Sequence, residues 1–288
     1  MFPIGDSPNP RGIAWVTYAL IAVNVVVYVL CLPMMNQPAD LNDPVAREYL
    51  EMLQSDHAIP ADQMQMAARQ LRQYDLFVFE HGSRPSNPSL IDMLKSMFLH
   101  AGFMHLFGNM LFLWIYGNNA EHRLGRFFYL AAYLATGYAA AFGDMLLRPD
   151  SGIPAVGASG AISGVLGMYF IWFPHNKVRM LVFLPPFLMQ PFDLPARWVL
   201  GFYIVAQNIV PVVLGGSGGG GVAHGAHIAG FVAGGARALG DQVLERVGAA
   251  RPPKRGASEA DVRESHAQAP GTAGGPLGVY PKAHPRGE

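Results

Sequence analysis

Charged residues are scarce in this chain, and their scarcity argues against a soluble fold. Only 14% of the 288 residues are Asp, Glu, Lys or Arg, whereas 51% are hydrophobic and the mean hydropathy is +0.22. A soluble domain usually carries about 25% charged residues. The apolar residues gather in long blocks, which predicts an all-α polytopic membrane protein.

The chain also lacks an excess of either charge and has a single cysteine. Lys and Arg number 20 and Asp and Glu number 20, so no nucleic-acid partner is expected. Cys31 alone excludes an intramolecular disulfide and a cluster of thiolate metal ligands, and no cofactor or metal is expected. No basic segment precedes the first apolar block, which is longer than a signal-peptide core, so we expect a membrane span there.

Six apolar blocks are predicted to cross the membrane. They lie at about residues 13–35, 103–121, 127–147, 159–173, 196–214 and 222–243. A cytoplasmic N-terminus at residues 1–12 precedes this membrane domain, which extends over residues 13–247. Residues 248–288 contain almost no large apolar side chains, so we expect a disordered cytoplasmic tail.

The connections between the spans are expected to differ in structure. The long outer loop at residues 36–92 carries apolar residues at helical spacing, with an N-cap and first-turn proline at Asp43 and Pro44, which predicts short interfacial helices. Residues 174–195 are apolar but interrupted by prolines, so we expect an interfacial segment. The glycine-rich residues 215–221 predict a flexible loop.

Lysine and arginine are distributed unequally between the two sides of the predicted membrane domain. Six spans place both termini on one side, and that side holds most of the basic residues of the short connections. The short loops of the opposite side hold only Arg148. Because positive charge marks the cytoplasmic side, both termini are expected in the cytoplasm.

One stretch, from Gly157 to Gly167, places a serine where a glycine-containing turn becomes an apolar helix. The 15 residues from Ser159 to Phe173 span roughly 22 Å as a helix, less than the bilayer core of about 30 Å, so Ser159 is expected below the membrane surface. A hydroxyl placed there is a candidate nucleophile. Small residues also allow membrane helices to pack, and this stretch alone is compatible with packing only.

Further polar residues are predicted at the same membrane depth. His105 and Asn109 lie one turn apart on the second span, and His227 lies near the start of the sixth. With the topology above, all of them lie at the outer ends of their spans, as Ser159 does. Polar side chains within a membrane are costly and need partners or a purpose, so their convergence favours an outward-facing site.

Paired glycines offer a way to bring the fourth and sixth spans together. Gly160 and Gly164 form one Gly-x-x-x-Gly pair, and Gly230 and Gly234 form another. Such pairs allow close approach of helix backbones. Since His227 shares a face with the second pair, a crossing through these faces would bring its imidazole to Ser159, which needs a base to become nucleophilic.

The remaining polar residues of the spans are expected to be structural. They include His224 and His100, and also Asp144, which could orient a base but which nothing in the sequence links to His227. Asp241 follows His227 by 14 residues, roughly 21 Å along a helix, and is too far away to orient its ring. The sequence therefore predicts a Ser-His dyad rather than a triad.

Three motifs together resemble the signatures of the rhomboid intramembrane serine proteases. They are His100-x4-His105-x3-Asn109, Gly157-Ala158-Ser159-Gly160 and Gly225-Ala226-His227-Ile228-Ala229-Gly230. The stretch from Glu121 to Gly125 also resembles the end of the family's second span. The similarity covers about Ser89 to Val243. The middle of the outer loop lacks the tryptophan of many bacterial members and does not match the family.

The resemblance implies a rhomboid-like six-transmembrane-helix bundle, with a water-filled cavity open to the outer side. Ser159 would be the nucleophile and His227 the general base and acid, and the glycine-rich loop would belong to a mobile cap. The oxyanion hole would combine the Ser159 backbone N–H with His105 and Asn109. The supporting residues would be His100, Gly157, Gly160 and Gly230.

The implied reaction partners are transmembrane helices of other proteins, which must unwind locally before a peptide bond can be cut. The bilayer is the other expected partner, and the bacterial inner membrane is the expected location; no oligomeric state is predicted. One alternative is a catalytically inactive rhomboid-like protein that binds membrane clients, although such relatives typically lack the serine or the histidine. Another is a small-solute transporter, but the two halves show no inverted repeat.

Overall fold

The computed structural model describes residues 2–56, 59–184, 188–214 and 223–249. One compact unit comprises Met1–Gln242 and a second comprises Val243–Glu288; the second contributes only the last residues of one helix to the described part. The glycine-rich loop 215–221 and nearly all of the tail 248–288 lie outside the described residues, as do the predictions made for them.

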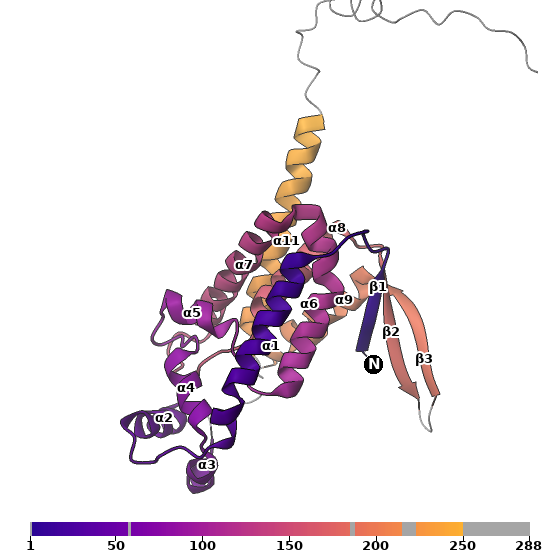
Figure 1. Ribbon diagram of the computed structural model, residues 1–288. Coiled ribbons are helices and arrows are strands. Elements are labelled where there is room, and N and C mark those ends of the chain that lie inside the picture. The colour runs from indigo at the N-terminus through magenta and orange to yellow at the C-terminus, as the bar shows by residue number, and fades with distance from the viewer. Residues whose placement is uncertain (1, 57–58, 185–187, 215–222, 250–288) are drawn as a thin grey trace, which may run out of the picture. The chain divides into compact units, whose positions relative to one another are not determined.

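Helices dominate the first unit, and the long ones coincide with the predicted apolar blocks (Figure 1). In the part of the chain that the structure describes, five are single helices: α1 (Trp15–Asn36), α6 (Phe103–Leu124), α7 (Arg126–Leu147), α8 (Ser159–Trp172) and α11 (His224–Ala249). One further block is a continuous helical run of three shorter elements, which are α9 (Ala196–Ile204), the π-helical η2 (Val205–Ile209) and α10 (Val210–Val213). The predicted class, a mostly helical polytopic membrane protein, is confirmed.

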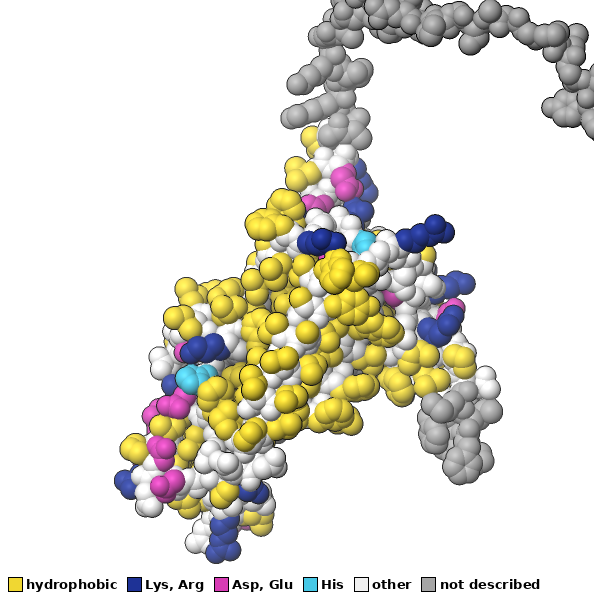
Figure 2. Space-filling view, in the orientation of Figure 1, with side chains coloured by type: hydrophobic (Ala, Val, Ile, Leu, Met, Phe, Trp, Pro, Cys, Tyr) yellow, Lys and Arg dark blue, Asp and Glu magenta, His cyan; other side chains and the backbone are white. Residues whose placement is uncertain are grey.

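The helix surfaces are suited to lipid. Within the described residues, Trp15–Asn36, Arg126–Leu147 and the continuous run Ala196–Val213 are long and apolar enough to cross a membrane, and α8 is shorter but apolar. Large side chains such as Leu30, Phe127 and Leu146 are 69%, 77% and 79% exposed. Figure 2 shows hydrophobic side chains covering the visible face of the helices. Such a surface is stable in lipid rather than in water, and the chain is an integral membrane protein.

The connection between α1 and α6 contains the short helices that were predicted for it. They are α2 (Pro44–Ser55), the 3-10 turn η1 (Ala61–Gln63), α3 (Met64–Gln70), α4 (Gln73–His81) and α5 (Leu90–Ser96). The Asp43 side chain accepts a hydrogen bond from the N–H of Val45, with Pro44 in the first turn, as the sequence indicated. Figure 1 shows α2, α3 and α4 gathered near the C-terminal end of α1.

The sequence did not predict the three-stranded antiparallel sheet that the structure contains. Its strands are β1 (Phe2–Ser7), β2 (Lys177–Leu184) and β3 (Leu188–Pro195), in the order β1-β2-β3. Pro191 pairs with Leu181 and Pro195 with Lys177, and both prolines lie on the edge strand β3, where a missing N–H is tolerated. The sheet lies beside α6 and α9 (Figure 1).

Helix α8 is the centre of the bundle, and ten consecutive residues from Gly160 to Tyr169 are buried. A Cβ atom at Gly160 would lie 2.6 Å from the Cβ of Ala140 in α7. On the other side, Cβ atoms at Gly230 and Gly234 of α11 would collide with the carbonyl oxygens of Gly160 and Gly164. The fourth and sixth apolar segments therefore cross through their paired glycines, as predicted.

Glu121 connects α6 to the start of α1. Its carboxylate, 3% exposed, accepts hydrogen bonds from the N–H of Val16 at 3.0 Å, the N–H of Thr17 at 2.8 Å and the Thr17 hydroxyl at 2.8 Å. The first N–H groups of a helix have no partner within it and carry partial positive charge, so a carboxylate stabilises them. Gly125, with φ +78°, then makes the one-residue turn into α7.

Asp6 links β1 to α6 and α8 through hydrogen bonds. Its Oδ2 accepts hydrogen bonds from the Tyr169 hydroxyl at 2.5 Å and from Nδ2 of Asn119 at 2.8 Å. Asn176 donates in turn to the Tyr169 oxygen at 3.0 Å. The N-terminal segment, for which the sequence predicted no structure, is thus part of the folded unit.

Candidate active site

A constrained turn places Ser159 at the first position of α8. Gly157 has φ +124°, which favours glycine, and its N–H donates to the carbonyl of Ser96 at 2.8 Å. A Cβ atom at Gly157 would lie 2.7 Å from Cε1 of His105 and 3.5 Å from Nδ2 of Asn109. Residue 157 therefore has to be glycine both for its backbone conformation and for the space it leaves.

The Ser159 hydroxyl and the His227 imidazole are in direct contact. Nε2 of His227 lies 2.8 Å from Oγ of Ser159, although 68 residues separate them in the sequence. The glycine contacts between α8 and α11 hold the two backbones close enough for these short side chains to meet. A serine hydroxyl paired with an imidazole is the arrangement that can generate a nucleophile.

A third residue, Asn208, completes this chain of hydrogen bonds. Its Oδ1 lies 2.8 Å from Nδ1 of His227, and its Nδ2 donates to the carbonyl of Tyr203 at 2.9 Å. Asn208 is 1% exposed and belongs to η2. The sequence prediction of an isolated Ser-His pair missed this contact, and the only available signal was a polar residue within an apolar span.

His105 and Asn109 lie beside the turn that precedes Ser159. Both side chains lie next to Gly157, since a Cβ atom added to that glycine would be within 4 Å of each of them. Asn109 is 8% exposed, and its Nδ2 has no hydrogen-bond partner among the residues that the structure describes. A buried donor without a partner is costly, and it is available to an oxygen that arrives with a ligand.

His100 supports this group without reaching Ser159. Its ring, 1% exposed, packs edge-on against that of His105, with centroids 5.2 Å apart. The hydroxyl of Tyr74 donates to the His100 carbonyl at 2.9 Å and accepts from its N–H at 3.1 Å. Helix α4, in the connection between α1 and α6, thereby fixes the segment that leads into α6.

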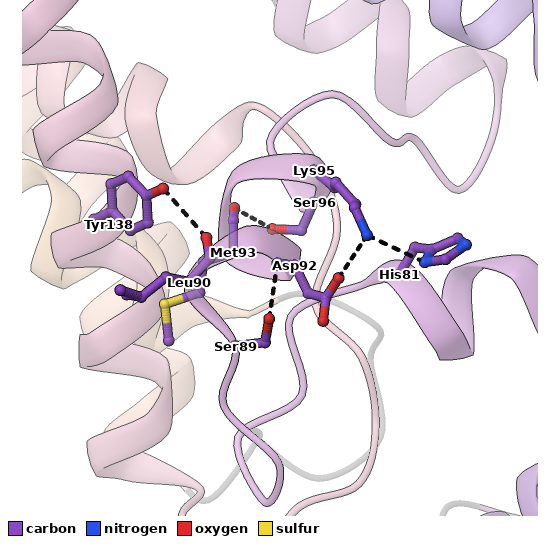
Figure 3. Close-up of polar contacts among 8 residues, drawn as sticks. All are labelled: His81, Ser89, Leu90, Asp92, Met93, Lys95, Ser96 and Tyr138. Carbon is purple, nitrogen blue, oxygen red and sulfur yellow. Dashed lines mark hydrogen bonds and ion pairs between the residues drawn. The ribbon is translucent and has the colours of Figure 1, made fainter.

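Helix α5 holds the other wall of the site. Figure 3 shows the Tyr138 hydroxyl of α7 donating to the Leu90 carbonyl at 3.2 Å, and the Ser96 hydroxyl donating to the Met93 carbonyl at 2.8 Å. Lys95 lies 3.0 Å from the Asp92 carboxylate and 3.5 Å from the His81 ring (Figure 3). These contacts fix the position of the Ser96 carbonyl, which accepts a hydrogen bond from the N–H of Gly157.

A small pocket of about 40 Å³ adjoins Ser159. Small side chains form most of its wall, and Ser83, Ser96 and Asp144 supply polar groups. Asp144 is engaged by Arg148, whose Nε and terminal nitrogen lie 3.1 Å and 2.5 Å from its two oxygens. The structure thus places Asp144 in an ion pair and not against His227. Among the described residues, no group of three or more His, Cys, Asp or Glu side chains could hold a metal ion.

Comparison with known proteins gives one family. The family model described as "Rhomboid domain" matches residues 87–240, more than half of the chain. Rhomboid protein 1, mitochondrial, of Saccharomyces cerevisiae is 36% identical over 102 residues, 34% of this chain and 30% of its own length. Rhomboid protease GluP of Bacillus subtilis is 39% identical over 75 residues, 26% of this chain and 14% of its own.

A longer match reaches more of the chain at lower identity. RHOMBOID-like protein 12, mitochondrial, of Arabidopsis thaliana is 26% identical over 148 residues, 46% of this chain and 41% of its own length. The chain thus covers less than half of the length of each of these three relatives.

Proposed function

The chain belongs to the rhomboid family, and from that premise we propose that it is an intramembrane serine endopeptidase. It would hydrolyse peptide bonds in or near the transmembrane helices of other membrane proteins. The observation that carries the proposal is the 2.8 Å contact between Oγ of Ser159 and Nε2 of His227. The word "protease" in the name of the Bacillus subtilis relative supports the same reaction class.

In this mechanism, His227 activates Ser159. As Oγ attacks the scissile carbonyl carbon, its proton moves to Nε2, and a tetrahedral intermediate forms. The imidazolium then returns the proton to the leaving amine, and the C–N bond breaks. Water, deprotonated by the same Nε2, hydrolyses the acyl-enzyme and restores the Ser159 hydroxyl.

The negative oxygen of the intermediate needs donors that are already in place. We assign this role to the backbone N–H of Ser159 and the side chains of His105 and Asn109. The buried, unpartnered Nδ2 of Asn109 supports the assignment, because its hydrogen bond would form only when an oxygen arrives. Preorganised donors of this kind each contribute about 3 kcal/mol to transition-state stabilisation.

The environment of the reaction follows from the distribution of charge. We propose that residues 13–247 form the membrane domain, that both termini lie in the cytoplasm and that the site opens to the outer side of a bacterial cell membrane. The basic residues of the short connections support this orientation, since they fall on the side of the termini. The substrate helix would reach the site from the bilayer and unwind locally to expose a bond.

The test is cleavage of a transmembrane substrate by the protein in lipid vesicles. Ser159→Ala should abolish cleavage, and Ser163→Ala should retain most of it, because Ser163 lies one turn further along α8 and contacts Tyr203 instead of His227. Thermal unfolding should show that both variants are folded. Undiminished cleavage by Ser159→Ala would refute the proposal. If the wild type cleaves none of a broad set of substrates, an inactive client-binding protein would be favoured instead.

A further inference from the structure

We infer that Asn208 is a positioning residue for His227, which it holds in the one tautomer that can accept the proton of Ser159. The inference rests on the proposed function and concerns a residue outside the motifs shared with the family. It follows from the hydrogen bonds of three side chains on three helical segments, η2, α11 and α8.

The orientation of the Asn208 amide follows from its neighbours. One end of the amide lies 2.9 Å from the backbone carbonyl of Tyr203, which can only accept a hydrogen bond. That end must therefore be the NH₂ group, and the end that faces His227 must be the oxygen. The amide oxygen accepts hydrogen bonds and cannot donate them.

The tautomer of His227 follows in turn. Since Oδ1 of Asn208 lies 2.8 Å from Nδ1, that nitrogen must carry the proton. In a neutral imidazole, the other nitrogen then has a free lone pair. Nε2 is that nitrogen, and it lies 2.8 Å from Oγ of Ser159, so it accepts the hydroxyl proton. The opposite tautomer would direct an N–H at Ser159 and leave no base.

Asn208 lies within the π-helical segment η2. The N–H of Val210 bonds to the carbonyl of Val205, five residues back, where an α-helix would step back four. This longer hydrogen-bond step rotates the residues of η2 relative to their positions in a regular α-helix. Such π-helical turns are often found at functional sites. Asn208 is 1% exposed, and each end of its amide has a hydrogen-bond partner, which offsets the cost of burying this polar group.

Asn208 takes no proton in the reaction. When Oγ loses its proton to Nε2, the imidazolium keeps its Nδ1–H on the amide oxygen, and the proton later leaves from Nε2. A neutral amide orients the ring and stabilises the imidazolium through its dipole only. A carboxylate at the same place would favour the imidazolium more strongly, because it adds an opposite charge.

The experiment compares Asn208→Ala and Asn208→Asp with wild type in vesicles, with kcat and KM measured across pH. Asn208→Ala should lower kcat at least about tenfold, with KM within about twofold, because the ring is no longer held in the productive tautomer. Asn208→Asp should recover most of kcat at alkaline pH and move the acid limb of the profile to higher pH. The matched control is Asn24→Ala in α1, which removes another buried amide that donates to a backbone carbonyl and should leave kcat unchanged.

The outcomes separate this inference from the proposed function. Wild-type kcat in Asn208→Ala, or an unmoved acid limb in a folded Asn208→Asp, would overturn the positioning role while Ser159→Ala remains inactive. Cleavage by Ser159→Ala would instead overturn the proposed function. Because a charge within the bundle can impair folding, the rate at which a fluorophosphonate labels Ser159 in Asn208→Ala gives a second readout. It should fall in parallel with kcat, and an unchanged rate would contradict the inference.

Discussion

Gly234 of α11 lies against the backbone carbonyl of Gly164 in α8, so closely that a Cβ atom at position 234 would collide with that oxygen. Gly230 has the same relationship to the carbonyl of Gly160, one turn away. The backbones of the two helices are therefore in direct contact within about two turns of Ser159 and His227. The position of His227 relative to Ser159 depends on this contact, because both side chains are short.

Gly234→Ala is expected to impair cleavage although residue 234 is seven positions away from His227. The added methyl group must push α11 from α8, and a displacement of about 1 Å at a reacting pair can cost about 100-fold in rate. Overpacking should also lower the unfolding free energy by about 1–3 kcal/mol. Gly240→Ala is the control, since a Cβ atom there has nothing within 4 Å. Equal activity of both variants would show that the glycine contact does not position the site.

Gly157→Ala should inactivate the protein by distorting the turn before Ser159. Alanine is disfavoured at φ +124°, at a cost of about 1–3 kcal/mol, and its methyl group would meet the His105 ring. Cleavage assays and thermal unfolding measure the two effects. Gly102→Ala should be tolerated, because position 102 is extended and has open space around it. A fully active Gly157→Ala would mean that the turn can move freely.

Glu121→Ala should destabilise the fold by about 3 kcal/mol. It leaves the N–H groups of Val16 and Thr17 and the Thr17 hydroxyl without their acceptor in a buried place. Glu48→Ala is the matched control, because Glu48 is 64% exposed and pairs with Arg84 at the surface, where such pairs contribute less than about 1 kcal/mol. Unfolding in a denaturing detergent measures both, and equal losses would contradict the assigned role of Glu121.

Asp6→Asn should change stability in a pH-dependent way. Burial raises the pKa of the Asp6 carboxyl above its usual 3.8, against the hydrogen bonds from Tyr169 and Asn119 that lower it. The folded protein therefore favours the protonated form, and this contribution is lost as pH rises above 3.8 through the raised pKa. Asparagine keeps an acceptor oxygen and does not ionise.

The Asp6→Asn variant should thus gain stability relative to wild type as the pH is raised from about 4 to about 7. Thermal unfolding at both pH values measures the difference, with the exposed Asp62→Asn as control. A difference that does not change with pH would show that burial of Asp6 has no effect on its ionisation.

Local sequence patterns predicted much of the fold and part of the site. The helix that begins at Ser159 and the paired glycines are local patterns, and they suffice to predict that His227 approaches Ser159, as it does at 2.8 Å. The N-cap at Asp43 was equally visible, because cap and helix are adjacent in the sequence.

The missed features depend on contacts between distant segments. Strand β1 pairs with β2 from Phe2 opposite Leu181 to Ser7 opposite Lys177, and no local pattern links these segments. Asn208 contacts His227, 19 residues away in the sequence, from a π-helical segment, and regular α-helical spacing of about 3.6 residues per turn does not describe that segment. The bonds of Glu121 to the start of α1 likewise join residues 104 and 105 positions apart.

Covalent labelling by a fluorophosphonate, with the modified residue located by mass spectrometry, tests most directly whether His227 activates Ser159. Wild type should be labelled at Ser159, and His227→Ala and Ser159→Ala should both lose that label while remaining folded. Labelling of Ser159 at the wild-type rate in His227→Ala, or a wild type that cleaves its substrate without being labelled at Ser159, would contradict the account.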